Sequence, residues 1–326
     1  MDGEVRGGRG AGDVIVLGGG VIGLSTALVL AEQGRRVRVW TRDPARATTS
    51  AVAGALWWPY RIEPEAPVGA WSLTSLRVYE QLALRPPETG VRMVPGVHAG
   101  VELGGLGPWA RRLTDLRQLP AGETPGGYGS ALWARLPLID MPVHLDWLRT
   151  RLETAGAVVE SREVRSLDEA AAEAPVVVNC AGLGARDLVP DPDVTPVRGQ
   201  LVLVENPGID SWFTAADDVS HLTTYFFPQP GRLILGGTAE PGERSLEPDP
   251  ATAAAIVGRC AEIRPEIAGA QIIGHRVGLR PVRSKGVRLE VDPGTSATRL
   301  IHNYGHGGAG VTVAWGCAYA SAALAS

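Results

Sequence analysis

The sequence of 326 residues contains a single lysine, Lys285, so thirty of its 31 basic residues are arginines. No glycine-rich phosphate loop precedes Lys285, which argues against the P-loop class of nucleotide hydrolases because that loop needs a lysine. Only three cysteines occur, Cys180, Cys260 and Cys317, and their wide spacing fits neither a zinc motif nor a disulfide framework. This pattern favours a reducing compartment, so we expect a cytoplasmic location.

The chain also lacks an excess of positive charge and a continuous hydrophobic run. Its formal net charge is −4, which gives no basic footprint for a nucleic-acid partner. Residues 14–31 are uncharged but contain four glycines, which argues against a membrane span or a secretory signal. The first twelve residues contain five glycines and predict a flexible tail.

A glycine fingerprint near the start of the chain lies between two apolar runs. Residues 14–17 predict a buried strand and residues 24–33 predict a helix, with Gly18, Gly20 and Gly23 between them. The first glycine permits the tight turn, the second lets the backbone approach a pyrophosphate, and the third lets helix and strand pack. Because the helix N-terminus favours negative charge, the segment predicts a dinucleotide site; the alternative is an ordinary tight turn.

The residues after the next predicted strand, 37–40, leave the type of nucleotide open. An acidic residue near this point binds the ribose hydroxyls in the dinucleotide motif. Asp43 lies twenty residues beyond Gly23 but past the strand end, and Arg42 beside it is suited to a phosphate. The alternative is a solvent-exposed charge pair in a turn, which weakens an NAD interpretation more than a general nucleotide site.

Two further segments predict binding of anionic or polarised groups. Residues 302–312 hold four glycines within six positions ahead of an apolar helix, and their free N–H groups suit an anionic oxygen, unless the segment is simply a flexible loop. Two glycine-rich helix starts far apart in sequence favour a large cofactor held at both ends. Arg280 carries the planar fork that binds a carboxylate, although among thirty arginines a surface charge is the more common role.

The order of the predicted elements indicates a mixed α/β protein. A helix after residue 143 and a buried strand at residues 176–180 repeat the pattern of the first segment. Residues 60–141 and 199–283 have the texture of antiparallel strands, hairpins and loops. We therefore expect two domains, each built from separate stretches of the chain.

Five segments together resemble the D-amino-acid oxidase family of flavoproteins, which also contains D-aspartate oxidase. In chain order they are residues 18–27, 48–54, 178–182, 277–283 and 301–312. The last, with His-Asn-Tyr-Gly-His-Gly-Gly-Ala-Gly ahead of a helix containing Trp-Gly-Cys, is the most specific, and all five follow the family's order. The resemblance covers most of the chain.

The resemblance implies a Rossmann-like FAD-binding domain and a second, mainly antiparallel-sheet substrate-binding domain, both discontinuous in sequence. The FAD-binding domain would consist of residues 13–56, 143–197 and 286–326. The substrate-binding domain would consist of residues 57–142 and 198–285, and residues 1–12 would remain a flexible tail.

The resemblance also implies non-covalent FAD, no metal, and a defined set of cofactor-binding residues. The three fingerprint glycines would hold the pyrophosphate, Val164 would lie by the adenine, and the terminal glycine-rich loop would face the flavin. The full set is Gly18, Gly20, Val21, Ile22, Gly23, Arg42, Asp43, Thr48, Thr49, Ser50, Gly54, Leu56, Val164, Cys180, Gly182, Arg280, His306, Gly307, Gly308, Gly310, Val311 and Thr312.

Substrate-binding residues follow from the same resemblance. Arg280 matches the arginine that binds the substrate carboxylate, and Tyr225 matches the tyrosine that hydrogen-bonds the same group. The carbonyl of Gly308 would accept a hydrogen bond from the substrate amine. No catalytic acid or base is expected, because the α-hydrogen leaves as a hydride to flavin N5, so His302 and His306 are expected to be structural.

Two positions depart from the family pattern. His221 stands where many relatives carry a tyrosine on a mobile lid, and Trp58 stands where relatives have glutamine. D-aspartate oxidase has serine in place of Gly308, so this glycine favours neutral or apolar substrates, although His221 is able to tune the site for an acidic side chain. Lid behaviour and pocket polarity stay open.

The expected function is oxidative deamination of neutral or apolar D-amino acids to 2-oxo acids, ammonia and hydrogen peroxide. The expected partners are the small-molecule amino acid and oxygen, without nucleic acid or membrane, and a homodimer is left open. The alternatives within the fold are a D-aspartate oxidase or a glycine or sarcosine-type amine oxidase. More distant alternatives are an NAD(P)-dependent dehydrogenase and a regulatory protein that binds a flavin or nucleotide.

Overall fold

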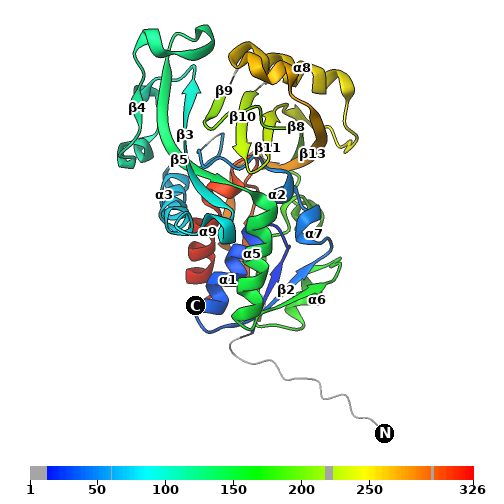
Figure 1. Ribbon diagram of the computed structural model, residues 1–326. Helices are drawn as coiled ribbons and strands as arrows, with labels where there is room; N and C mark the ends of the chain where they lie inside the picture. Colours follow the sequence, from blue (N-terminus) through cyan, green and yellow to red (C-terminus); the bar gives the residue numbers. More distant parts are fainter. Residues whose placement is uncertain (1–12, 60, 217–222, 295–296) are drawn as a thin grey trace.

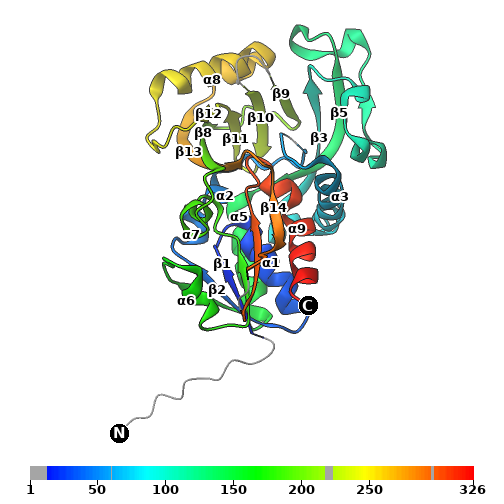
Figure 2. The ribbon, with the colours of Figure 1, turned by 180° about the vertical axis from the view of Figure 1, so that it is seen from behind.

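The computed structural model describes residues 13–59, 61–216, 223–294 and 297–326. The predicted tail and His221 lie outside the described residues. Two β-sheets organise the molecule, one in its lower half and one in its upper half as seen in Figure 1 and, from behind, in Figure 2. The mixed α/β architecture expected from the sequence is confirmed.

The lower sheet has six strands in the order β14-β15-β7-β1-β2-β6. All neighbouring pairs are parallel except β14 with β15, which is antiparallel. Their bounds are β1 Asp13–Leu17, β2 Arg36–Thr41, β6 Val158–Ser161, β7 Val176–Asn179, β14 Arg288–Val291 and β15 Arg299–Tyr304. Because the strands come from three distant parts of the chain, the sheet is assembled from a discontinuous sequence.

Alternate residues of β1 pack on opposite faces of this sheet, as the period of a strand requires. Val14 and Val16 belong to the large core that contains the helices α1 (Val21–Glu32), α5 (Met141–Thr154) and α9 (Gly310–Leu324). Ile15 and Leu17 belong to a smaller core on the other face, with the short helix α6 (Leu167–Ala171). Both faces are therefore covered, as is usual for parallel sheets.

The upper sheet has nine strands, in the order β12-β8-β11-β10-β9-β3-β5-β4 with β13 also paired to β8. Its pairs are antiparallel apart from β3 with β9, which is parallel. The bounds are β3 Val91–Ala99, β4 Arg117–Gln118, β5 Ala131–Ile139, β8 Val194–Val204, β9 Trp212–Ala216, β10 Thr223–Gln229, β11 Arg232–Gly236, β12 Glu240–Pro241 and β13 Ile272–Arg283.

Helix α8 (Pro250–Ile263) covers the outer face of this upper sheet. On β8, Val202 and Val204 pack in the core shared with Ile256 of α8. Leu203 between them faces the opposite side and belongs to the large core that continues into the lower half. The inner face of the sheet is therefore turned toward the other half of the molecule.

Two helices correct the expectation that residues 60–141 and 199–283 contain only strands and loops. Helix α3 (Glu65–Leu82) spans 18 residues, and α8 spans 14. Pro67 and Gly69 obscure α3 in the sequence, but a proline is tolerated in the first turn of a helix. The Ser75 hydroxyl of α3 accepts a hydrogen bond from the N–H of Gly316, which joins α3 to α9.

Several short helices complete the chain. The one-turn α-helices are α2 Thr49–Val52, α4 Pro86–Thr89 and α7 Ala185–Leu188. The 3₁₀ helices are Ala45–Ala47, Leu103–Gly105, Pro108–Arg112, Ala121–Glu123, Pro125–Gly127, Gly182–Gly184 and Pro265–Gly269. They lie in the connections between the longer elements.

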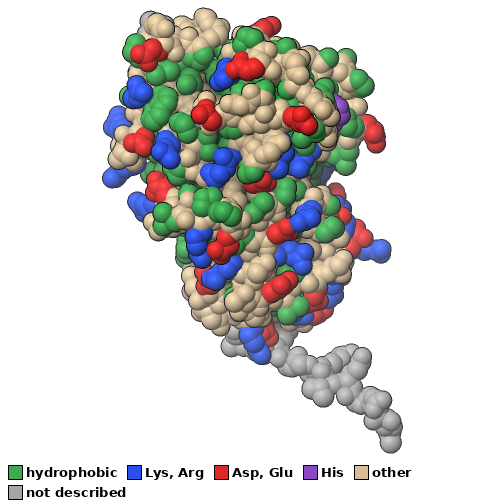
Figure 3. Space-filling model, in the orientation of Figure 1, with side chains coloured by type: hydrophobic (Ala, Val, Ile, Leu, Met, Phe, Trp, Pro, Cys, Tyr) green, Lys and Arg blue, Asp and Glu red, His purple; other side chains and the backbone are tan. Residues whose placement is uncertain are grey.

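The uncharged run at residues 14–31 is divided between β1 and α1, which agrees with the expectation that it is not a membrane span. Among the helices that the structure describes, none combines the length and the apolar character needed to cross a membrane. Side chains of both charge signs are interspersed over the face shown in Figure 3, and the basic ones form no continuous stripe there.

Candidate active site

A cavity of about 1170 Å³ lies between the two sheets and is lined by elements of both. It brings together almost all of the residues predicted to bind cofactor or substrate. Those that line it are Gly18, Gly20, Val21, Ile22, Arg42, Asp43, Thr48, Thr49, Ser50, Gly54, Leu56, Trp58, Val164, Cys180, Gly182, Tyr225, Arg280, His306, Gly307, Gly308, Gly310, Val311 and Thr312. Gly23 lies just behind the lining, and the structure does not describe His221.

The first predicted helix start forms one end of this cavity. Gly18 has a φ of +111°, and a Cβ there would lie 2.4 Å from the Cys180 carbonyl oxygen; a Cβ on Gly23 would lie 1.9 Å from the Gly18 carbonyl oxygen. The N-cap residue of helix α1, Gly20, supplies no side-chain cap, and the first turn has no acidic residue. The positive dipole end of the helix therefore suits an anionic group such as a pyrophosphate.

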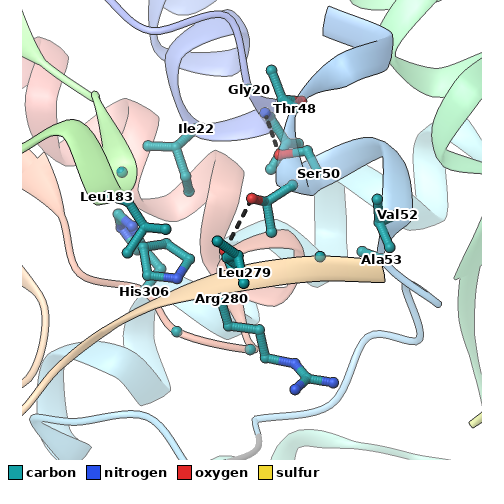
Figure 4. Close-up of a pocket in the computed structure, with 18 of the residues that line it drawn as sticks. Gly20, Ile22, Thr48, Ser50, Val52, Ala53, Leu183, Leu279, Arg280 and His306 are labelled. Atoms are coloured by element: carbon teal, nitrogen blue, oxygen red, sulfur yellow. Dashed lines mark hydrogen bonds between the residues drawn. The ribbon is translucent and has the colours of Figure 1, made fainter. Parts of the chain in front are cut away.

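Hydroxyl groups of the segment at residues 48–50 border the same end. The Ser50 hydroxyl accepts a hydrogen bond of 2.9 Å from the N–H of Val21, and Thr49 donates one of 3.0 Å to the carbonyl of Leu279. Figure 4 shows Thr48, Ser50 and Leu279 around the cavity, with the Arg280 side chain extending away from Gly20 and Ile22. The segment thus connects the start of α1 to strand β13.

Arg42 and Asp43 form an ion pair of 2.8 Å with each other at the edge of the cavity. This is the turn charge pair that the sequence left as an alternative, although both residues do line the cavity. Beside them, the Arg162 guanidinium lies 3.7 Å from the centroid of the Trp40 ring. Trp40 and Arg162 also line the cavity and were not predicted, because neither belongs to a motif.

The second glycine-rich helix start lies against the same cavity. Helix α9 begins at Gly310 with no side-chain cap and no acidic residue in its first turn, as α1 does. The Thr312 hydroxyl donates to the Trp58 carbonyl at 3.0 Å and accepts from the Trp58 N–H at 3.3 Å. Its hydroxyl is therefore bound to the protein's own backbone, and the expected role toward the cofactor falls to the backbone of this turn.

Arg280 lies in the cavity without a carboxylate partner. A guanidinium nitrogen donates to the Thr238 carbonyl at 2.9 Å, and the guanidinium lies flat over Gly199, where an added Cβ would come within 2.4 Å of it. Within the described part of the chain, Arg280 makes no ion pair with an acidic side chain. A forked cation is thus held in place with donors left for an external carboxylate.

Tyr225 approaches the region of Arg280 from strand β10, which β8 and β11 separate from β13. Its ring lies across Gly236 and stacks on Phe227 with centroids 4.7 Å apart. A Cβ built on Gly237 would lie 2.9 Å from the Tyr225 hydroxyl, and the next residue, Thr238, accepts the hydrogen bond of Arg280. The tyrosine hydroxyl and the arginine guanidinium therefore converge on one stretch of backbone.

Gly308 lies against the stem of Arg280, because a Cβ at this glycine would be 3.4 Å from the arginine Cδ. This contact brings the glycine-rich loop before α9 to the arginine. The positive start of a helix, a loop with exposed backbone and a forked cation therefore border one part of the cavity.

Two lining residues that the sequence analysis missed are His98, which lies next to Trp58, and Thr214, which lies next to His98. The Trp58 and His98 rings have centroids 4.8 Å apart, and His98 Nδ1 lies 3.3 Å from the Thr214 hydroxyl. Burial lowers the pKa of His98 to about 4, so the ring is neutral at physiological pH. A histidine inside an ordinary strand pattern carries no motif that reveals this position.

Two further titratable groups that line the cavity are buried and neutral. Burial lowers the pKa of His306 to about 3 and raises that of Cys180 to about 12, so neither is charged near pH 7. His302 hydrogen-bonds Asp292 at 2.8 Å. Over the described residues, no group of three or more histidine, cysteine or acidic side chains is placed to hold a metal ion.

The buried Nε2 of His306 has no hydrogen-bond partner within the described structure. With the tight glycine turn and the two helix starts, this polar atom fits a large bound molecule that carries an anionic bridge and a polar ring system. FAD has both features, and the residues of the cavity fit it.

Comparison with known proteins supports this fit. The family described as FAD dependent oxidoreductase matches residues 13–324. A D-amino-acid oxidase of Streptomyces coelicolor is 64% identical over 316 residues, which cover 97% of each chain. A D-amino-acid oxidase of Rubrobacter xylanophilus is 46% identical, covering 98% of this chain and 97% of that protein. The D-aspartate oxidase of Homo sapiens is 31% identical, covering 96% and 94%.

The fold is similar to solved structures as well. Glycine oxidase from Geobacillus kaustophilus has a TM-score of 0.82 at 21% identity, covering 96% of this chain and 94% of that one. With two helix starts facing one cavity and a family match that extends over nearly the whole sequence, this chain belongs to the FAD-dependent oxidoreductases.

Proposed function

We propose that this protein is a D-amino-acid oxidase, which converts neutral and apolar D-amino acids to 2-oxo acids, ammonia and hydrogen peroxide. The observation that carries the proposal is that the side chains of Arg280 and Tyr225 converge in the cavity. The Arg280 guanidinium is held by a hydrogen bond to a backbone carbonyl, and no acidic side chain among the described residues balances its charge. This pair provides a forked cation and a hydroxyl for one carboxylate. The two bacterial D-amino-acid oxidases at 64% and 46% identity support the same activity.

The residues of the cavity divide into regions suited to the parts of FAD. The start of α1, with Gly18, Gly20 and Gly23, fits the pyrophosphate, and Val164, which lines the same cavity, would lie by the adenine. The loop from Gly305 and the start of α9 fit the flavin, where the helix N-terminus stabilises negative charge. When bound, FAD supplies an acceptor for a hydride from the substrate and transfers the electrons to oxygen.

The protein's own residues then bind and orient the substrate. Arg280 and Tyr225 hold the carboxylate, and the carbonyl of Gly308 accepts a hydrogen bond from the amine. The acidic residues that line the cavity, within the residues described, are Asp43, Glu163 and Asp187. None of the three lies on a strand of the upper sheet, which carries Arg280 and Tyr225. The protein therefore contributes by positioning the α-carbon rather than by removing a proton.

Domain boundaries and location are part of the same proposal. We place the FAD-binding domain at residues 13–56, 143–197 and 286–326 and the substrate-binding domain at 57–142 and 198–285, in keeping with the strands of the two sheets. All three cysteines are buried and unpaired, which supports a reducing, cytoplasmic environment.

A panel of amino acids tests the proposal. The purified flavoprotein is incubated with D- and L-forms of alanine, valine and leucine, with D-aspartate and with glycine, and 2-oxo acid, ammonia and peroxide are measured. We expect equal amounts of the three products from neutral D-forms and none from L-forms. Turnover only with glycine or D-aspartate would favour the related alternatives, and turnover that requires added NAD(P) would contradict the oxidase.

A further inference from the structure

Three side chains form what we call the side-chain wall of the cavity: Trp58, His98 and Thr214. The Trp58 and Trp109 rings are nearly perpendicular, with centroids 5.2 Å apart at an interplanar angle of 88°, and the Trp58 and His98 rings are tilted at 44° to each other. The hydroxyl of Thr214 in turn lies beside His98 Nδ1. His98 therefore connects the aromatic part of the wall to the sheet.

Strand register places this wall beside the proposed carboxylate site. His98 pairs with Thr214 across β3 and β9, and Thr214 pairs with Tyr225 across β9 and β10. Directly paired residues point to the same face of a sheet, so the three side chains form one row on the cavity side. In the order of the strands, β10, which carries Tyr225, lies between β9 and β13, which carries Arg280.

The wall is also anchored to the region that fits the flavin. At the start of α9, the Thr312 hydroxyl hydrogen-bonds both the N–H and the carbonyl of Trp58. In the loop before α9, Gly308 contacts the stem of Arg280. The wall and Arg280 therefore flank one glycine-rich segment. A substrate whose carboxylate binds Arg280 and Tyr225 has room for its side chain on the side of the wall.

None of the three wall side chains carries a charge at physiological pH. Trp58 and Thr214 have no ionisable group in this range, and burial keeps His98 neutral. A charged substrate side chain placed here would lose hydration without gaining a partner from the wall, which is costly.

We propose that His98 is a specificity-determining residue, which with Trp58 and Thr214 contacts the substrate side chain and selects neutral D-amino acids over acidic and basic ones. The proposal rests on the proposed oxidase function and adds the residue that sets its selectivity. It assigns a role to a side chain that belongs neither to the sequence motifs nor to the carboxylate-binding pair Arg280 and Tyr225.

The variant His98→Lys places a cation in the wall. We expect the ratio of kcat/KM for D-aspartate to that for D-leucine to rise about tenfold or more, which is the scale of one charge-assisted hydrogen bond. The variant His98→Gln remains neutral and keeps a hydrogen-bonding group, so its ratio should stay near the wild-type value. Thr214→Lys introduces the same charge from the neighbouring strand. It replaces His98→Lys in the test if that variant does not fold.

A matched control separates this local effect from a change in net charge. Leu84 is 74% exposed and does not line the cavity, so Leu84→Lys should leave the ratio unchanged. Bound flavin per protein shows whether each variant is folded.

Two results would overturn the proposal. One is wild-type protein that oxidises D-aspartate as efficiently as D-leucine, and the other is folded lysine variants at both wall positions that leave the ratio unchanged. Either result, with D-alanine still oxidised, leaves the proposed function intact. Failure to oxidise any D-amino acid would instead reject the oxidase itself.

Discussion

The guanidinium of Arg280 differs from those of its neighbours in how its charge is balanced. Arg198 forms an ion pair with Glu240 at 3.0 Å, and Arg283 forms one with Asp191 at 2.8 Å. Arg280 has only carbonyl partners among the residues described. A partly buried cation that is bound but not neutralised is suited to a ligand carboxylate.

Replacing Arg280 by leucine should lower kcat/KM for D-alanine about a hundredfold or more, because charge-assisted hydrogen bonds contribute about 1.5–3 kcal/mol each. Bound flavin per protein should stay near wild type. Arg280→Lys should retain part of the activity, since lysine keeps the charge but not the fork. Steady-state kinetics measure these effects.

The control for this prediction is Lys285→Leu, at a side chain that is 71% exposed. Equal kinetics for both leucine variants would show that Arg280 does not bind the substrate.

Gly199 provides a second test, because it lies directly beneath the same guanidinium. An added Cβ would be 2.4 Å and 2.5 Å from the two terminal nitrogens of Arg280. The end of this flexible side chain would move rather than the sheet, so Gly199→Ala should displace the cation and leave the fold intact. We expect about a tenfold loss of kcat/KM, the scale of one charge-assisted hydrogen bond.

The control for this prediction is Gly258→Ala in helix α8, where an added Cβ meets nothing within 4 Å. Thermal unfolding and flavin content should be similar in both alanine variants. Wild-type kinetics in Gly199→Ala would show that the position of the guanidinium does not limit substrate binding.

At the scale of elements, local sequence patterns predicted secondary structure well where one continuous segment forms a strand, a turn and a helix. The predicted strand at residues 14–17 corresponds to β1, and the predicted helix at 24–33 corresponds to α1, which begins three residues earlier. The wall residues His98 and Thr214 could not be predicted in this way. They lie on strands that pair in parallel across more than a hundred residues, and no local signal specifies that pairing.

The close packing of β1, its turn and α1 predicts the effect of Gly23→Ala. Since an added Cβ would lie 1.9 Å from the Gly18 carbonyl oxygen, the start of α1 would have to move away from the turn that fits the pyrophosphate. We expect affinity for FAD to fall about tenfold or more. Titration of apoprotein with FAD measures the loss. Gly104→Ala, where an added Cβ meets nothing, should bind FAD normally, and normal binding by both variants would contradict the prediction.

At the scale of the whole molecule, buried histidines couple stability to pH. Burial lowers the pKa of His98 and His144 to about 4 and of His306 to about 3, and it also lowers that of His302. In the unfolded chain these groups have a pKa of about 6.5. As the pH falls below that value, the unfolded chain binds protons that the folded protein does not, so the free energy of unfolding decreases.

Each such histidine contributes a slope of up to about 1.4 kcal/mol per pH unit between roughly pH 6.5 and its lowered pKa. Urea unfolding of the holoprotein at several pH values from 7 to 5 measures the slope. His144→Gln should flatten it by about one proton, whereas Leu84→Gln, at a side chain that is 74% exposed and not titratable, should not. A wild-type free energy of unfolding that is constant over this range would contradict the account.

The sheets also explain how much of the site the sequence could indicate. The glycine turns, Arg280 and Tyr225 belong to motifs, and the structure brings them to one cavity. Trp40, Arg162, His98 and Thr214 reach the same cavity only because strands from distant segments pair. The site residues that belong to motifs were therefore predictable from the sequence. The shape and charge of the rest of the cavity lining were not.

Anaerobic reduction of the bound flavin tests the central claim most directly. The purified holoprotein is mixed with D-alanine or L-alanine without oxygen and without NAD(P), and the visible flavin absorbance is followed. We predict that D-alanine bleaches the flavin, that oxygen restores its colour with about one peroxide formed per flavin, and that L-alanine has no effect. A flavin that stays oxidised with D-alanine and with every other neutral D-amino acid would contradict the account.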